Sequence, residues 1–340
     1  MKRSYMIPIL MFLLNNAEVK AQNPDYLYMV ENAIKAPSGH NTQPWLFKVN
    51  DDNIEIYPNY DKSLSVVDFD NRELFISLGC AAENLCIAAA EKGYSPILSI
   101  DRKGVITVRL LKSEGEAANN ELINQLDKRQ TNRSVYNGKR IPKDTIDMLA
   151  NISLEHSITS YFFENGTPAY DSITSYIVQG NKLQMTDRAF KNELKLWMRF
   201  NKKQSHKSRD GLSYAVYNAP NFPIFISKPI MSGFLNAKTQ NKGDLKKIGS
   251  SSHFVIFTAK NNTVEEWIML GRSLQRFILH CTRLDLAHAY ANQPCEIREL
   301  ASKLQQAIHI NNEHAIILLR IGYAAPTPYS LRKNVEEVLL

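Results

Sequence analysis

The amino-acid sequence predicts an α+β protein in which one chain contains two tandem halves. A β-strand, a long apolar helix with a central glycine and a further β-strand follow one another in that order twice along the chain. The small residues near the middle of each long helix would let the two helices approach closely. The chain has 340 residues, of which 44% are hydrophobic, so it can bury the core that such an architecture needs.

The first half opens with a predicted helix in "YLYMVENAIKA", where apolar residues recur at helical spacing. The helix gives way to a polar corner at 36–45, "APSGHNTQPW", because Pro37 disfavours helix in the residue before it and Gly39 permits a positive φ. A long amphipathic helix is predicted at 71–94. β-Strands are predicted at 45–49, 53–58, 95–100 and 105–111.

A polar stretch at 114–119 marks the predicted boundary between a first half at 22–118 and a second half at 119–340. The second half repeats the order of the first, and we expect its long helix, with Gly271 near the middle, to pack against the long helix of the first half. Because 198–243 is punctuated by proline and glycine and is poorly periodic, a lid-like insertion with little regular structure is expected there. The elements predicted for the second half are strands at 250–260 and 314–324 and a helix at 264–286.

The charge and cysteine patterns indicate neither a nucleic-acid-binding module nor a metal site. Much of the formal net charge of +7 falls in 199–210, and without a nucleic-acid-binding motif this run favours a solvated basic loop. Cys80 and Cys86 belong to the apolar pattern of a helix, and Cys295 lies near His288 without the further ligands of a zinc site. We therefore expect neither a nucleic-acid partner nor a bound metal.

The N-terminal residues 1–21 have the pattern of a secretory signal peptide, which predicts an exported, periplasmic protein. Lys2 and Arg3 precede an apolar run, and Val19 and Ala21 lie where small residues precede a cleavage point. The alternative is a cytoplasmic protein whose first helix is hydrophobic. No other run is apolar and long enough to cross a membrane, so no membrane span is expected in the mature chain.

A candidate phosphate site lies in the stretch "DKRQTNRSVYNGKRIP". Arg129, Thr131 and Arg133 occupy alternate positions at the end of a predicted amphipathic helix at 120–129. Arginine side chains offer forked donors that suit phosphate oxygens, and the threonine hydroxyl adds another donor. In the alternative interpretation, the three residues form a solvated helix end.

Three stretches taken together resemble the nitroreductase family of flavin enzymes. The corner "PSGHNTQPW" is similar to the family's Pro-Ser-x-x-Asn-x-Gln-Pro-Trp turn, and "RQTNR" is similar to its Arg-x-Ser/Thr-x-Arg/Lys phosphate motif. The strand "SSHFVIF" and the tail "RIGYAAPTP", with Arg332 beyond it, resemble the family's later strand and C-terminal arm. The resemblance extends over residues 25–340.

The order of these motifs departs from that of ordinary members, in which the arginine motif precedes the turn in one short subunit and two subunits share the flavin sites. Here the turn comes first, which resembles a single-chain subgroup sometimes called Acg-like. The resemblance therefore implies a monomer or weak homodimer with one complete site per chain. The second, pseudo-equivalent site is expected to be inactive because the first half has no arginine motif of its own.

The resemblance also implies roles for individual residues. Gln43 and Trp45 would hold the corner, and Lys247 would lie near the pyrimidine side of an FMN ring, with Asp244 as a further candidate. The stretch "ANQPCE" at 291–296 departs from the family pattern near the reactive ring nitrogen. The residues implied to bind the cofactor are Pro37, Ser38, Gly39, Asn41, Arg129, Thr131, Arg133, Lys247 and Arg332.

The function implied is that of an FMN-dependent oxidoreductase. NAD(P)H would reduce the flavin, and a small electron-poor acceptor, a nitroaromatic compound or a quinone, would reoxidise it in the same pocket by a ping-pong mechanism. The flavin carries the chemistry, so no catalytic side chain is named. The alternative is a lidded, flavin-free or flavin-sequestering protein without turnover. It is favoured by the insertion at 198–243 and by a signal that would export an unfolded chain.

Overall fold

The computed structural model describes residues 23–113 and 121–340. The predicted signal peptide at 1–21 and the predicted boundary at 114–119 lie outside the described residues. Helices and β-sheets alternate through the described residues, and the predicted α+β class is confirmed.

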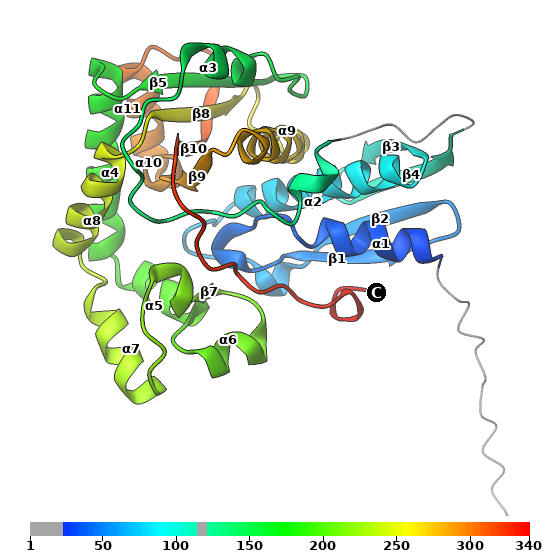
Figure 1. The fold of residues 1–340 in the computed structure, drawn as a ribbon, viewed down its shortest axis with the longest axis horizontal. Coiled ribbons are helices and arrows are strands. Elements are labelled where there is room, and N and C mark those ends of the chain that lie inside the picture. The colour runs from blue at the N-terminus through cyan, green and yellow to red at the C-terminus, as the bar shows by residue number, and fades with distance from the viewer. Residues whose placement is uncertain (1–22, 114–120) are drawn as a thin grey trace, which may run out of the picture.

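Two four-stranded sheets organise the molecule (Figure 1), and every neighbouring pair of strands in them is antiparallel. The first sheet has the order β1 (Trp45–Val49), β2 (Asn53–Pro58), β4 (Ile106–Lys112), β3 (Tyr94–Ile100). The second has the order β5 (Ile158–Glu164), β8 (His253–Ala259), β10 (His314–Gly322), β9 (Ala287–Tyr290).

The two long helices, α2 (Arg72–Glu91) and α9 (Val264–Arg283), cross in direct backbone contact, as expected. The Cα atoms of Gly79 and Gly271 lie so close to the opposite helix that an added Cβ on Gly79 would be 2.0 Å from the carbonyl oxygen of Ile268. Glu83 of α2 forms ion pairs across the crossing with Arg272 and Arg276 of α9. Glycine is therefore required on both helices at this crossing. The contact between the helices does not test whether the chain consists of two duplicated halves, which stays a prediction.

Strand β8 shows how one strand serves two cores. Val255 and Phe257 belong to the large cluster that contains α9 and α2, whereas Phe254 and Ile256 belong to a second cluster on the opposite face of the sheet. Both faces are covered, so every residue of β8 is buried, and residues 254–257 are all apolar. The second cluster is covered by α4 (Pro168–Thr186), α8 (Ala237–Gly249) and α11 (Arg298–Ala307).

Shorter helices complete the fold. Helix α1 (Pro24–Ala33) packs on α2, and α3 (Lys143–Ala150) lies beside β5. Helix α10 (Gln293–Glu296) follows β9 and contacts α4. By length and apolar composition, α2 is the one helix in the described part of the chain that could span a membrane, and most of it is buried in the protein core.

The helix predicted at 120–129 is wrong. The described part of this stretch contains only turns and a short 3-10 helix, Ile123–Gln125. Leu122 and Leu126 pack with Ile87 of α2 and Leu279 of α9. Contacts with two distant helices therefore fix the chain here, and they override the local helical pattern.

The expectation that 198–243 has little regular structure is also wrong. The stretch contains α6 (Lys202–Ser208), the two-residue strand β7 (Leu212–Ser213), which pairs with β6 (Met198–Arg199), and α7 (Ile224–Gly233), and it runs into α8. Met198, Leu212 and Met231 form a small core with residues of α5 (Arg188–Trp197). Figure 1 shows α5, α6 and α7 together at one end of the molecule, away from both sheets. We call residues 198–243 the lid segment.

Candidate functional site

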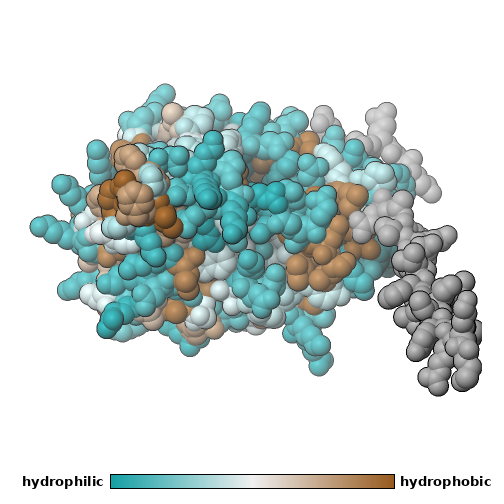
Figure 2. Space-filling view, turned by 90° about the horizontal axis from the view of Figure 1, so that it is seen from below, coloured by the Kyte–Doolittle hydropathy of each residue, from teal (hydrophilic) through white to brown (hydrophobic). Residues whose placement is uncertain are grey.

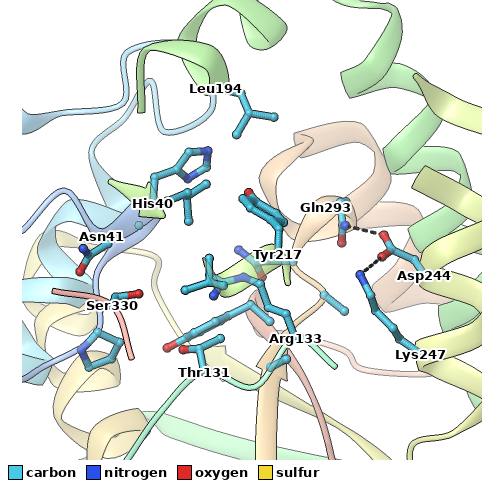
Figure 3. Close-up of a pocket in the computed structure, with 18 of the residues that line it drawn as sticks. His40, Asn41, Thr131, Arg133, Leu194, Tyr217, Asp244, Lys247, Gln293 and Ser330 are labelled. Atoms are coloured by element: carbon cyan, nitrogen blue, oxygen red, sulfur yellow. Dashed lines mark hydrogen bonds and ion pairs between the residues drawn. The ribbon is translucent and has the colours of Figure 1, made fainter. Parts of the chain in front are cut away.

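One cavity of about 830 Å³ brings together all nine residues that the sequence predicts around a cofactor. Figure 3 shows side chains from the corner, the arginine motif, α8 and the C-terminal tail pointing into this cavity. The nine residues are Pro37, Ser38, Gly39, Asn41, Arg129, Thr131, Arg133, Lys247 and Arg332. Their placement makes a shared site geometrically possible, and their roles in binding stay predictions.

The corner after α1 has an unusual backbone. His40, Asn41 and Gln43 all adopt positive φ, at 47°, 58° and 56°. Such conformations are uncommon for residues other than glycine, and they persist where the surroundings hold them. Gly39 packs against Glu73, whose Oε2 atom would lie 3.3 Å from a Cβ at this position. The tight corner presents backbone and short polar side chains to the cavity.

Hydrogen bonds from distant segments hold the corner. Ser38 Oγ accepts a bond from the Gln43 amide at 3.0 Å, and the Gln43 side chain donates to the Arg209 carbonyl at 2.8 Å. The same side chain accepts from the Lys333 amide at 2.8 Å. Trp45 is fully buried in the core. These contacts agree with the expectation that Gln43 and Trp45 hold the corner, and they tie it to the lid segment and the tail.

Arg129, which is buried, and Arg332, which is half-buried, form a pair of like charges. Arg129 is buried and donates to the Lys35 carbonyl at 2.5 Å, and Arg332 donates to Asn41 Oδ1 at 2.7 Å and to the Ala36 carbonyl at 3.1 Å. The Nε atom of each arginine is buried without a hydrogen-bond partner. Among the described residues, no carboxylate lies within ion-pair distance of either guanidinium. Burial and the charge of Arg129 lower the pKa of Arg332 to about 9.

The positive charges of Arg129 and Arg332 have no negative partner among the described residues. Buried charges in proteins are normally paired, because an isolated charge in a low-dielectric region is costly. An anion bound beside Arg129 and Arg332 would supply the missing counter-charge and could accept charge-assisted hydrogen bonds from the guanidinium groups. The pair is therefore suited to a phosphate group.

The segment that carries Thr131 and Arg133 is fixed against the second sheet. Thr131 forms a parallel bridge with His288 of β9, and the Asn132 amide donates to the His288 carbonyl at 2.8 Å. Arg133 is half-buried in the cavity wall, and burial together with the Arg133 charge lowers the pKa of His40 to about 4. His40 is therefore neutral near pH 7, and the positive charge at this side of the cavity comes from arginine.

Lys247 lies in the cavity wall as part of a polar network. Its ammonium forms an ion pair with Asp244 at 3.1 Å, shown as a dashed line in Figure 3. Asp244 also accepts from Asn181 at 3.0 Å and from Gln240 at 3.1 Å. The predicted cation is thus present at the cavity, and its charge is partly balanced by the aspartate that the sequence offered as a second candidate.

Two carboxyl groups at the cavity were missed by the sequence reasoning. Glu73 of α2 and Glu296 of α10 both line the cavity, and burial raises the pKa of each carboxyl group. Asn292 donates to Glu73 at 2.7 Å, and Gln184 donates to Glu296. The only sequence signal was the unusual stretch at 291–296, because nothing local places the first turn of α2 beside α10.

The raised pKa of Glu73 predicts a pH-dependent stability. Burial and then the charge of Glu296 raise the pKa of Glu73 from 4.5 to about 8. Between about pH 5 and pH 8 the unfolded chain loses this proton while the native protein keeps it, so the native state binds more protons and the free energy of unfolding falls as pH rises. A single titrating group changes the free energy of unfolding by at most ~1.4 kcal/mol per pH unit.

We expect Glu73→Gln to decline less in stability than the wild type between pH 5 and pH 8, measured by urea denaturation at several pH values. Glu31→Gln, at an exposed position of α1, is the matched control and should keep the wild-type pH dependence. Equal slopes for wild type and Glu73→Gln would show that Glu73 does not retain a proton in the native state.

The part of the cavity that is lined by α5 and the lid segment is apolar. Met185, Leu194, Met198, Leu212 and Met231 line it and belong to one small core cluster. Methionine side chains adapt readily to apolar ligands of different shape. The cavity therefore combines a cationic, hydrogen-bonding wall with an adaptable apolar wall, as sites for aromatic cofactors and substrates commonly do.

Within the described residues, no group of three or more His, Cys, Asp or Glu side chains could hold a metal ion. No protein-family model matches the chain. The chain is similar to proteins from two strains of Mycobacterium tuberculosis, each named "Putative NAD(P)H nitroreductase", with 22% identity over 317 residues, 90% of this chain and 88% of each relative.

Solved structures give weaker likenesses. The FMN-dependent nitroreductase of Mycobacterium smegmatis in complex with NADPH has a TM-score of 0.39 and 12% identity, over 59% of this chain and 86% of that chain. A nitroreductase with bound FMN from Bacteroides fragilis has a TM-score of 0.37 and 13% identity, over 61% and 90% of the two chains. The near full-length match to the mycobacterial relatives confirms the resemblance to nitroreductases, and the single-chain subgroup stays a prediction.

Proposed function

We propose that this protein is an FMN-dependent oxidoreductase that passes reducing equivalents from NAD(P)H to a small electron-poor acceptor, a nitroaromatic compound or a quinone, by a ping-pong mechanism. The observation that carries the proposal is the pair Arg129 and Arg332, which has no acidic partner among the described residues and faces a cavity large enough for an aromatic cofactor. The names of the mycobacterial relatives support the same reaction class.

The chain's own residues fit the groups of FMN. Arg129 and Arg332, with Arg133 nearby in the same wall, would hold the phosphate through charge-assisted hydrogen bonds. The corner at Ser38 and Asn41 would provide polar contacts, and its backbone would form a close wall. Bound FMN would supply the two-electron chemistry between nicotinamide and acceptor.

The remaining residues would control the surroundings of the reaction. Lys247 would contribute positive charge near the cofactor, moderated by Asp244. The apolar wall below the lid segment would exclude water and receive the flat part of nicotinamide or acceptor in turn. All these residues come from one chain, so the proposed site needs no partner subunit.

A second candidate function is a flavin-sequestering protein without turnover. The lid segment favours it, because its helices and the core around Met231 cover the apolar side of the cavity where an acceptor would enter. The export proposed for residues 1–21 also favours it, because an unfolded chain would have to acquire FMN outside the cytoplasm.

Anaerobic reduction separates the two functions. Protein reconstituted with FMN should lose its flavin absorbance on addition of NADH or NADPH and regain it on addition of a benzoquinone. Steady-state oxidation of the nicotinamide should give parallel lines in double-reciprocal plots, as a ping-pong mechanism requires. Bound FMN that neither nicotinamide reduces would favour the sequestering function and contradict the proposed enzyme.

A further inference from the structure

Helix α7 exposes an unusual amount of apolar surface. Phe225 is 75% exposed, Phe234 is 58% exposed and Ile230 is 50% exposed. Phe222, Ile224 and Ile226 are also exposed. In Figure 2, a patch of hydrophobic side chains lies at the end of the molecule where Figure 1 places α7. Contiguous apolar patches on a protein surface commonly mark sites that meet a protein, a ligand or a membrane.

Helix α7 has a buried side that packs on the protein, and its exposed apolar side chains lie outside that buried side. Ser227 and Met231, one helical turn apart, are the buried residues of α7, so the helix turns a serine inward while Phe225 points outward. Ile230 and Phe234 are exposed and also line the cavity. The apolar surface of α7 is therefore continuous with the cavity wall.

The region of the chain that contains the apolar patch is rich in basic residues. Residues 198–249 contain ten lysines and arginines and only two aspartates, so this region carries more positive charge than the formal net charge of +7 of the whole chain. One of the two aspartates, Asp210, is buried against Arg199, and the other pairs with Lys247. The exposed lysines include Lys202, Lys203, Lys207, Lys228, Lys238 and Lys242.

We propose that α7 and these lysines dock the protein on the surface of an anionic lipid bilayer, with the apolar side chains of 222–234 in the interfacial region. Exposed apolar residues flanked by lysine are the composition of interfacial helices, which combine apolar burial with attraction to anionic lipids. A symmetric contact with a second copy would bring the same positive patches together, which opposes that arrangement.

Docking would place the cavity wall at the membrane surface, since Ile230 and Phe234 belong to both. An apolar acceptor dissolved in the bilayer would then meet the cavity without crossing bulk water. The docking itself does not depend on bound flavin, so a failure of docking and a failure of the proposed oxidoreductase activity give separate results.

Co-sedimentation with lipid vesicles tests the docking. Wild-type protein should bind vesicles of 30% phosphatidylglycerol in phosphatidylcholine at low salt, and should bind pure phosphatidylcholine vesicles far more weakly. Lys228→Glu should lower the affinity at least five-fold, since each lysine near an anionic surface contributes roughly a five-fold gain. Phe225→Ser should lower the affinity on the order of ten-fold through loss of apolar burial.

Matched controls are Lys103→Glu and Met148→Ser, at exposed positions outside the lid segment, and they should bind as the wild type does.

Three results would overturn the proposal. One is wild-type binding to the anionic vesicles that Phe225→Ser leaves unchanged. Another is a dimer in sedimentation equilibrium that Phe225→Ser dissociates, without vesicle binding, because the patch would then join two copies. The third is binding to single-stranded RNA but not to vesicles. Circular dichroism and thermal melting of each variant establish that it is folded before the binding is compared.

Discussion

Arg129→Ala is expected to weaken FMN binding by a factor of about 10 to 100, whereas the affinity for riboflavin should change far less. Arg129 is buried beside Arg332 and lines the cavity, so a bound phosphate would gain a charge-assisted hydrogen bond of roughly 1.5 to 3 kcal/mol from its guanidinium group. Riboflavin lacks the phosphate, so the difference between the two ligands isolates this contact. Flavin fluorescence titrations of wild type and variant measure both affinities.

Two variants control this experiment. Arg102→Ala removes an exposed arginine in the turn before β4 and should leave both flavin affinities unchanged. Arg129→Lys keeps the charge but loses the forked donor geometry, and should lie between wild type and Arg129→Ala. Small and equal losses for FMN and riboflavin in Arg129→Ala would remove Arg129 from the phosphate site.

Gly79→Ala is expected to lower the free energy of unfolding by about 3 kcal/mol or more, since overpacking costs 1 to 3 kcal/mol and backbone contacts cannot yield as side chains do. The new Cβ would lie 2.0 Å from the Ile268 carbonyl oxygen, so α2 and α9 would have to move apart. This effect opposes the gain of ~1 kcal/mol that alanine normally gives over glycine inside a helix. Urea denaturation monitored by circular dichroism gives the change.

Gly243→Ala is the matched control for the crossing. Gly243 lies inside α8, and a Cβ on it would meet no atom within 4 Å. This variant should be as stable as the wild type or more stable by up to ~1 kcal/mol. If Gly79→Ala were equally well tolerated, the close crossing of α2 and α9 would be contradicted.

The sequence predicted the elements whose signals are local. The bounds of β1 and β2 coincide with the prediction, because Trp45, Phe47, Ile54 and Ile56 alternate with less buried residues. The long helices were predicted a few residues too long, since the apolar stripe continues into the turns that follow them. The corner at 36–45, the arginine motif and the C-terminal tail together resemble one family, and this resemblance named the nine site residues.

The elements that were missed depend on contacts between distant parts of the chain. The segment at 120–129 has a helical pattern, but packing on Leu279 and Ile87 holds it in turns. Helix α7 was missed because periodicity identifies helices that bury their apolar side, and this one exposes Phe225 and its neighbours. The pair Glu73 and Glu296 exists only because α2 and α10 meet at the cavity, which no local pattern encodes.

The proposed function requires one complete flavin site built within a single chain, and the flavin content of the purified protein tests this requirement most directly. The protein is saturated with FMN, freed of excess ligand and denatured, and the released FMN is quantified by absorbance against the protein concentration. We predict one FMN per chain, held where Arg129 and Arg332 meet the corner at Asn41. Release of no FMN would contradict the site, and release of two would contradict the expectation that the second, pseudo-equivalent site is inactive.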